Sequence, residues 1–371
     1  WSLAYASSPN GTDWTPGSAG LDIVDSLEPS RPPRVALHGS GSNTFQVRGE
    51  STGVLPEPLV PGYSYAALAY GWSAEILAGS WADLGDLGAE SNGGIRLDAI
   101  ADVADGTEHT FWTVTNRAGR DRIAWTSDLT SEIGLFEGSR SGFERSGVSH
   151  PVPFVLNGET HMLYAGIRNG RQSIGLATLE GGVWNSAGRV IATSSDDWDS
   201  VSIVPNSIVP TSDGVRLWYS GFDGARWRVG SARSSDGETW TRDEAPRGYQ
   251  FGLGEPGSWD DSGVRDGWSI IDESGEHLWY SGFDGNTWRI GYAFRADGES
   301  SFERSLNPFT EEGRAVVVPD SGLFHRSNVT RPVVYKTDSG LQMYYAGESG
   351  DQTRVGTAFG IDFDRFNRTP Q

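Results

Sequence analysis

The chain has 371 residues, a formal net charge of −20 and no cysteine. This length is enough for one large all-β domain or two ordinary ones. The acidic balance argues against a nucleic-acid partner, which needs clustered positive charge, and the lack of cysteine excludes disulfides and thiol chemistry. No stretch of about 18 apolar residues occurs, so no membrane span is predicted.

The N-terminal segment matches the end of a repeat found later in the chain. Leu3–Gly11 aligns position for position with Ile290–Gly298, and Trp14 matches the tryptophan that begins a fourth strand. No first or second strand precedes it, so we expect residues 1–30 either to complete a unit elsewhere or to follow missing residues. A start at Trp1 rather than Met, with no signal peptide in view, is typical of a processed or trimmed form.

Residues 31–90 fit the repeat less well. Val35–His38 and Thr44–Gly49 are predicted as its first and second strands, and Ala66–Tyr70 as its third. The proline-rich segment Leu55–Pro61 is then a loop. This region is interpreted as a diverged unit or an insertion.

From residue 93 to residue 369 one hairpin pattern recurs five times. Its clearest copies, Leu217–Gly224 and Leu278–Gly285, are identical in sequence and each precedes a short apolar strand. An anchor residue precedes an apolar residue by 11 positions in every copy: Trp112 and Ile123, Leu163 and Ile174, Trp218 and Val229, Trp279 and Ile290, Tyr344 and Val355. A constant offset indicates a hairpin of fixed length, with the turn at Gly and Asp-Gly.

Each unit is read as four strands. For residues 200–245 these are Val201–Val209, Val215–Ser220, Trp227–Ala232 and a strand that begins at Trp240. Tandem units that are too small to bury their own faces pack side by side and close into a propeller. We therefore predict an all-β fold, a five-bladed β-propeller that forms one domain over residues 1–371. The alternative is six blades, with the diverged blade at residues 31–90.

The segment Gly257–Asp266, which leads into Leu278–Gly282 and Arg289–Ala293, resembles the repeat of the five-bladed propeller glycoside hydrolases. These include the arabinanases and xylosidases, the invertases and levansucrases, and the mannoside phosphorylases. The resemblance covers roughly residues 93–369. It implies catalytic carboxylates on the innermost strands, pointing into the mouth of the axial channel, but fold does not fix activity.

The resemblance directs attention to the first strand of each unit. The residues 13 or 14 positions before the anchors are Asp98, His150, Val204, Asp266 and Arg331. His150 and Arg331 each precede a proline, as the first-strand polar residue of the family often does. Arg265-Asp266 resembles the Arg-Asp of the invertase group, whose Asp stabilises the transition state, with Gly267 in place of the proline of that motif.

Cleavage of a glycoside needs one carboxylic acid to protonate the leaving oxygen and a second carboxylate to attack the sugar or activate water. Asp98 and Asp266 are the predicted pair. The family supplies its general acid as a Glu from a middle blade, but Ser202–Asn206 contains no acid, and Glu255 is the candidate replacement. The candidate substrate-binding residues are His150, Arg265 and Arg331, with Trp259 and Trp268 as sugar-stacking candidates near the mouth of the first strands.

The predicted function is that of a glycosidase-like propeller acting on a furanoside or similar glycan in the axial pocket, outside the cell or at its surface. It needs no cofactor, although a structural calcium ion is an option for an inner-strand acid. The missing middle-blade acid favours a second hypothesis, a non-catalytic propeller that binds carbohydrate or protein. A third is a structural surface protein. The oligomeric state is not predicted.

Overall fold

The computed structural model describes residues 2–8, 15–16, 44–50, 96–102, 108–115, 120–126, 134–245, 248–305, 315–319, 327–337, 340–349 and 352–368. Nearly all regular structure in these ranges is β-strand. The exception is a single 3-10 turn, η1 (Gly142–Glu144). Within the same ranges, no helix is long and apolar enough to cross a membrane. The all-β prediction is confirmed.

Four-stranded antiparallel units follow one another along the chain from residue 96, and a single parallel bridge between Asp121 and Gly147 joins the first two into one sheet. The first consists of β4 (Arg96–Asp102), β5 (Glu108–Thr115), β6 (Asp121–Thr126) and β7 (Gly134–Phe136). The second consists of β8 (Gly147–Leu156), β9 (Glu159–Arg168), β10 (Arg171–Glu180) and β11 (Val183–Ile191). The third consists of β12 (Ser202–Thr211), β13 (Gly214–Phe222), β14 (Trp227–Ser234) and β15 (Thr241–Arg242).

The last two described units complete the series. The fourth consists of β16 (Gly263–Asp272), β17 (Gly275–Phe283), β18 (Trp288–Ala296) and β19 (Glu303–Arg304), and β20 (Ala315–Val317) also pairs with β18. The fifth consists of β21 (Asn328–Thr337), β22 (Gly340–Ser349), β23 (Gln352–Asp362) and β24 (Arg365–Arg368). The four strands predicted for residues 200–245 are thus present, with ends that move by a few residues.

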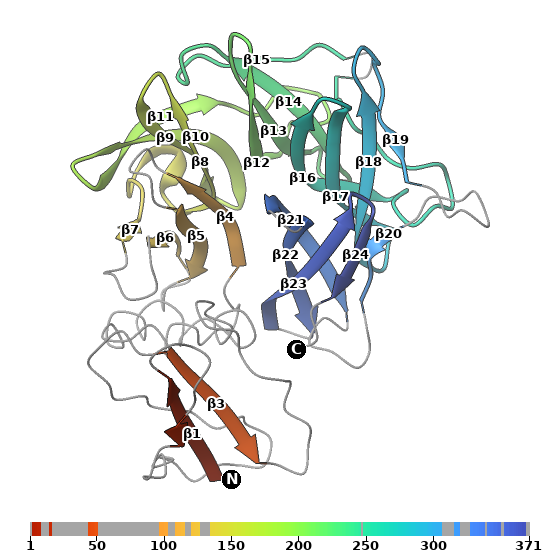
Figure 1. Cartoon of the computed structure of the whole chain (residues 1–371). Coiled ribbons are helices and arrows are strands. Elements are labelled where there is room, and N and C mark those ends of the chain that lie inside the picture. Colours follow the sequence, from red (N-terminus) through yellow and green to blue (C-terminus); the bar gives the residue numbers. More distant parts are fainter. Residues whose placement is uncertain are drawn as a thin grey trace.

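These units are arranged as the blades of a propeller (Figure 1). The first strand of each blade packs on strands of the blade before it: β8 on β5 and β6, β12 on β9 and β10, β16 on β13 and β14, and β21 on β17 and β18. The series closes because β4 contacts β21, β22 and β23. Closure gathers the first strands around one axis, so side chains from distant parts of the sequence meet there.

Apolar side chains fill the space between neighbouring blades. Trp218, Val229, Leu278 and Ala293 are fully buried in one cluster that joins the third and fourth blades. Burying one large apolar side chain stabilises a protein by about 1.5–3 kcal/mol. A single blade has no such cover on its own, which explains why the repeats form one closed array.

The Asp-Gly dipeptides make the predicted hairpin turns. Gly224 and Gly285 have φ values of 98° and 95°, a region that favours glycine. Asp284 accepts two backbone amides of its turn and a hydrogen bond from Arg289, and Asp223 does the same in its own blade. Burial alone would raise the pKa of Asp284, but the hydrogen bonds from Arg289 and the turn amides outweigh it and lower the pKa.

The strand register corrects the alignment of the first blade by one residue. Thr113 pairs with Ile123, whereas the equivalent pairs in the other blades join residues nine positions apart: Ala165 with Ile174, Ser220 with Val229, Ser281 with Ile290, and Ala346 with Val355. The hairpin of the first blade is one residue longer, so Phe111 rather than Trp112 occupies the anchor position.

Near the N-terminus, β1 (Ser2–Ser8), β2 (Thr15–Pro16) and β3 (Thr44–Glu50) form a three-stranded sheet in the order β2-β1-β3. In this order β1 takes the place of the third strand of a blade, β2 that of the fourth and β3 that of the second. The predicted strands Val35–His38 and Ala66–Tyr70 and the loop Leu55–Pro61 lie outside the described residues. The sixth blade and the division of the chain into one domain stay predictions.

Candidate functional site

Each of the five described first strands is interrupted by a bulge at one point of its pairing with the second strand. The residues at these points are Asp98 in β4, His150-Pro151 in β8, Asn206 in β12, Asp266-Gly267 in β16 and Arg331-Pro332 in β21. All face equivalent positions of the second strand. The propeller therefore places one polar residue per blade at the same level of its axis.

The bulges are of two kinds. Every bulge sets two residues of the first strand against one residue of the second. In three bulges both residues are unpaired, and the first of each pair is a non-glycine residue with positive φ: 56° at His150, 57° at Asp266 and 55° at Arg331. The bulges at Asp98 and Asn206 leave one residue unpaired. A left-handed non-glycine residue costs about 1–3 kcal/mol and persists where the surroundings fix it, often at functional sites.

Val204 lies 14 positions before Trp218 and pairs with Ser220, as Arg265 pairs with Ser281 in the fourth blade, so it precedes the bulge. The unpaired residue of the third-blade bulge is Asn206, 12 positions before Trp218. Val204 is 3% exposed and belongs to the core. The structure places Asp98, His150, Asp266 and Arg331 at the bulges of their blades.

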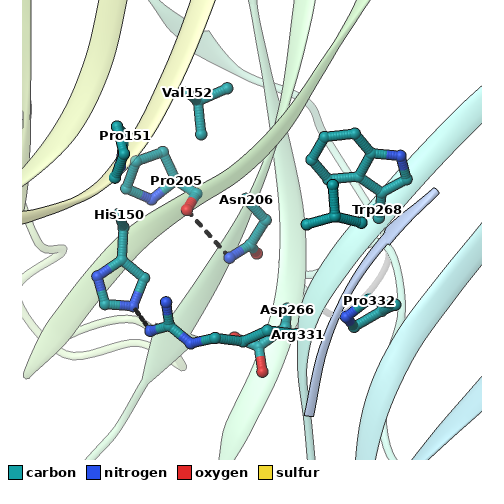
Figure 2. A pocket seen from close by; sticks show the side chains of 10 residues that line it. His150, Pro151, Val152, Pro205, Asn206, Asp266, Trp268, Arg331 and Pro332 are labelled. Carbon is teal, nitrogen blue, oxygen red and sulfur yellow. Dashed lines mark hydrogen bonds between the residues drawn. The ribbon is translucent and has the colours of Figure 1, made fainter. Parts of the chain in front are cut away.

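A pocket lies among these bulges (Figure 2). Its cavity volume is about 30 Å³, which holds one or two water molecules and is too small to enclose a sugar ring. The residues that line it are His150, Pro151, Val152, Pro205, Asn206, Asp266, Trp268, Arg331, Pro332 and Val333. They come from the first strands of four blades.

Asp266 is 6% exposed and is held through one of its oxygens. Ser281 Oγ donates to Asp266 Oδ2 at 2.8 Å, and Arg265 Nε lies 3.2 Å from the same oxygen. Among the described residues, no hydrogen bond or ion pair reaches Oδ1. Arg265 itself does not line the pocket, and its guanidinium lies 4.1 Å from the ring centre of Trp288.

Arg331 and His150 meet across the pocket from the fifth and second blades (Figure 2). The guanidinium of Arg331 only donates hydrogen bonds, so Nε2 of His150 is the acceptor. His150 Nδ1 lies 2.8 Å from Ser149 Oγ. These contacts correspond to a neutral imidazole with its proton on Nδ1.

Trp268 forms another part of the pocket wall, away from His150 (Figure 2). Its Nε1 donates to the backbone oxygen of Val334 at 2.8 Å, and its ring packs edge-on against Tyr335 with the ring centres 5.6 Å apart. The hydrogen bond to the neighbouring blade fixes the indole at the pocket. Trp268 therefore occupies a position where a ring could contact a sugar.

Trp259, a sugar-stacking candidate from the sequence, does not line the pocket and has an equivalent, Trp198, in the third blade. It stacks on Tyr280 with the ring centres 5.7 Å apart, as Trp198 stacks on Tyr219 at 5.4 Å in the third blade. Gly282 lies directly under the indole. The signal that sequence reasoning missed is a Trp-Asp pair just before each of these first strands.

Glu255 is exposed and lies in the loop before β16, where its carbonyl accepts the amide of Ser258 at 2.9 Å. It is not among the pocket residues. At the third-blade bulge stands Asn206, whose Oδ1 accepts from Ser220 Oγ at 2.6 Å. Within the described pocket lining, Asp266 is the sole carboxylate. The side chain of Asp98 lies outside the described part of the structure.

The described residues offer no group of three or more His, Asp or Glu side chains arranged to hold a metal ion. The calcium site suggested by the sequence is therefore not located in the described ranges.

The chain shares its fold with solved structures of glycoside hydrolases. A glycosyl hydrolase from Bacteroides ovatus superposes with a TM-score of 0.53 at 15% identity, over 74% of this chain and 86% of the other. A thermostable family-43 glycoside hydrolase gives 0.53 at 14% identity, over 74% and 94%.

A third similar structure belongs to the GH130 family of mannoside phosphorylases, which contains glycoside hydrolases that target β-1,2 mannosidic linkages. It gives a TM-score of 0.52 at 17% identity, over 74% of this chain and 86% of the other. No family profile matches the chain, and no curated protein matches it by sequence. At these identities the likeness establishes the propeller fold.

Proposed function

We propose that the protein is a glycoside hydrolase that acts on the end of a glycan, a furanoside or a similar sugar, at the axial pocket. The observation that carries the proposal is that polar residues from the five first-strand bulges lie at one level of the propeller axis. They include a buried carboxylate at Asp266 and a second acidic residue, Asp98, at the equivalent position of the first blade. The shared fold with glycoside hydrolases supports the same reading.

In this proposal Asp266 acts as the charged carboxylate that faces the developing positive charge at the anomeric carbon. Ser281 and Arg265 hold it through Oδ2 and leave Oδ1 toward the ligand. Asp98 supplies the second carboxyl group. Arg331 and His150 bind sugar hydroxyls, and Trp268 packs against the ring. Because the cavity is small, the sugar sits at its mouth.

The test is a screen of glycans with mass spectrometry of the products, followed by Asp266→Asn and Asp98→Asn. Each variant should lower kcat at least about 1,000-fold while the circular dichroism spectrum and melting temperature stay close to those of the native protein. Asp261→Asn is the matched control, since this Asp lies in the loop just before β16 and outside the pocket. Full activity in both pocket variants contradicts the assignment.

A second candidate is a propeller that binds carbohydrate without cleaving it, located outside the cell or at its surface. Two observations favour it: Asn206 stands where a middle-blade acid is expected, and Glu255 is exposed away from the pocket. Calorimetric titration with the same glycans separates the two functions. Binding that is lost in Arg331→Ala, with no product from the native protein, establishes the second candidate.

A further inference from the structure

Buried hydroxyl groups on second strands hold the bulges with two unpaired residues in the neighbouring blades. In each case the amide of the left-handed residue donates to a hydroxyl of the preceding blade. The three bonds join Asp266 to Ser220 at 2.8 Å, Arg331 to Ser281 at 3.0 Å and His150 to Thr113 at 3.1 Å. Ser220 and Ser281 are fully buried, and Thr113 is 3% exposed.

The residue type at this second-strand position correlates with the kind of bulge in the first strand of the next blade. The equivalent positions in the five blades are Thr113, Ala165, Ser220, Ser281 and Ala346. Each hydroxyl residue precedes a bulge with two unpaired residues. Ala165 precedes the bulge at Asn206, which has one unpaired residue. Ala346 lies on β22, which contacts β4, the strand with the bulge at Asp98. A bulge with two unpaired residues removes an amide from its own ladder, and that amide needs an acceptor that alanine lacks.

Two of these hydroxyls also donate to a polar side chain of their own blade. Ser281 Oγ donates to Asp266 Oδ2 at 2.8 Å, and Ser220 Oγ donates to Asn206 Oδ1 at 2.6 Å. A continuous series of hydrogen bonds therefore runs from the Arg331 amide through Ser281, Asp266 and Ser220 to Asn206. It crosses three blades at the level of the pocket.

We propose that Ser281 and Ser220 are positioning residues of the axial site. Ser281 fixes the Asp266 carboxylate and the Arg331 backbone at once, so both are presented to a ligand at a set separation. Ser220 does the same for Asn206 and the Asp266 backbone. The assignment of this site to a glycan rests on the proposed function. The positioning of the pocket residues by the two serines does not.

The test compares Ser281→Ala with Ser281→Thr, which keeps the hydroxyl, in the intact chain. Ser231→Ala is the matched control, because Ser231 is also buried and donates to a carboxylate, Asp243, outside the pocket. The first readout is hydrogen exchange of the Arg331 amide by NMR. Ser281→Ala should speed it about tenfold, and the other two variants should stay within about twofold of the native rate.

The second readout is the carboxyl ¹³C resonance of Asp266 at pH 7, identified by its loss in Asp266→Asn. It should move in Ser281→Ala and stay in place in Ser281→Thr and Ser231→Ala. An unchanged resonance and exchange rate in Ser281→Ala overturns the proposal. The same changes in Ser231→Ala also overturn it, since they indicate general loosening.

These measurements need no substrate, so they test positioning even if the glycan screen yields no product. If a substrate is found, Ser281→Ala should lower kcat about 10- to 100-fold with little change in KM, because a misplaced catalytic group costs rate more than binding. Native kcat in Ser281→Ala, beside a large loss in Asp266→Asn, rejects positioning while the proposed function stands.

Discussion

Trp259 and Trp268 of the fourth blade are only nine residues apart, but they have different roles. Trp268 lies in the wall of the pocket and is tied to the next blade by its indole nitrogen. Trp259 packs over Tyr280 within its own blade. Residue type alone does not separate the two, but Trp259 belongs to a Trp-Asp pair that recurs at Trp198, and Trp268 does not.

Replacement of Trp259 should therefore affect stability and spare ligand binding. Trp259→Ala should lower the free energy of unfolding by about 3 kcal/mol, toward the lower end of the range for a large aromatic residue because the ring is partly exposed. Urea denaturation measures this loss. Glycan affinity, measured at a temperature where the variant is folded, should match that of the native protein. A loss of affinity without a loss of stability contradicts the packing role.

At the pocket, the sequence indicated which residue types gather but not the details of how they are held. Distance from an anchor selects Asp98, His150, Asp266 and Arg331, and these residues fall at the bulges. Asn206 lies 12 positions before its anchor, outside the window of 13 or 14 positions. A hydroxyl residue or an alanine on the second strand of the preceding blade distinguishes the two kinds of bulge.

At the scale of strands and turns, the hairpins were the most predictable elements. The Asp-Gly turn has a local physical cause: a positive φ and a carboxylate that accepts turn amides. Local causes can be read from a short motif. The contacts between blades could not be read in this way, since a residue such as Ser281 acts on Arg331, 50 positions along the chain.

The turn itself gives a prediction. Gly285→Ala should lower the free energy of unfolding by about 1–2 kcal/mol, because φ is 95° while the added methyl group meets nothing closer than 3.6 Å. Gly263→Ala is the control, since its nearest contact is 3.4 Å and its φ is not in the left-handed region. It should change the free energy of unfolding by less than about 0.5 kcal/mol. Equal effects of the two variants in thermal denaturation would exclude backbone conformation as the cause.

At the scale of the whole molecule, buried histidines link stability to pH. Burial lowers the pKa of His277, although Asp272 beside it acts in the opposite direction. Burial also lowers the pKa of His161. The unfolded chain then binds more protons than the folded one just below the ordinary histidine pKa of 6.5, so stability falls as pH falls through that value.

Urea denaturation at pH 7.5 and pH 5.5 tests this link. The native protein should have a lower free energy of unfolding at pH 5.5. His277→Gln should lose less between the two pH values, because it lacks one of the groups that take up a proton on unfolding. Equal pH dependence in the two proteins would remove His277 from the explanation. Asp272 does not interfere, since its pKa is lowered and it titrates at a more acidic pH.

The five described blades are each made from one continuous stretch of chain, and no described strand of the first blade pairs with a strand of the fifth. Among the described strands, the contact of β4 with β21, β22 and β23 thus includes no shared backbone ladder. A pulling force applied between residues 96 and 368 would part these two sheets before it draws any strand out of its ladder. In a single-molecule extension experiment the first rupture should therefore be small, early and quickly reversible.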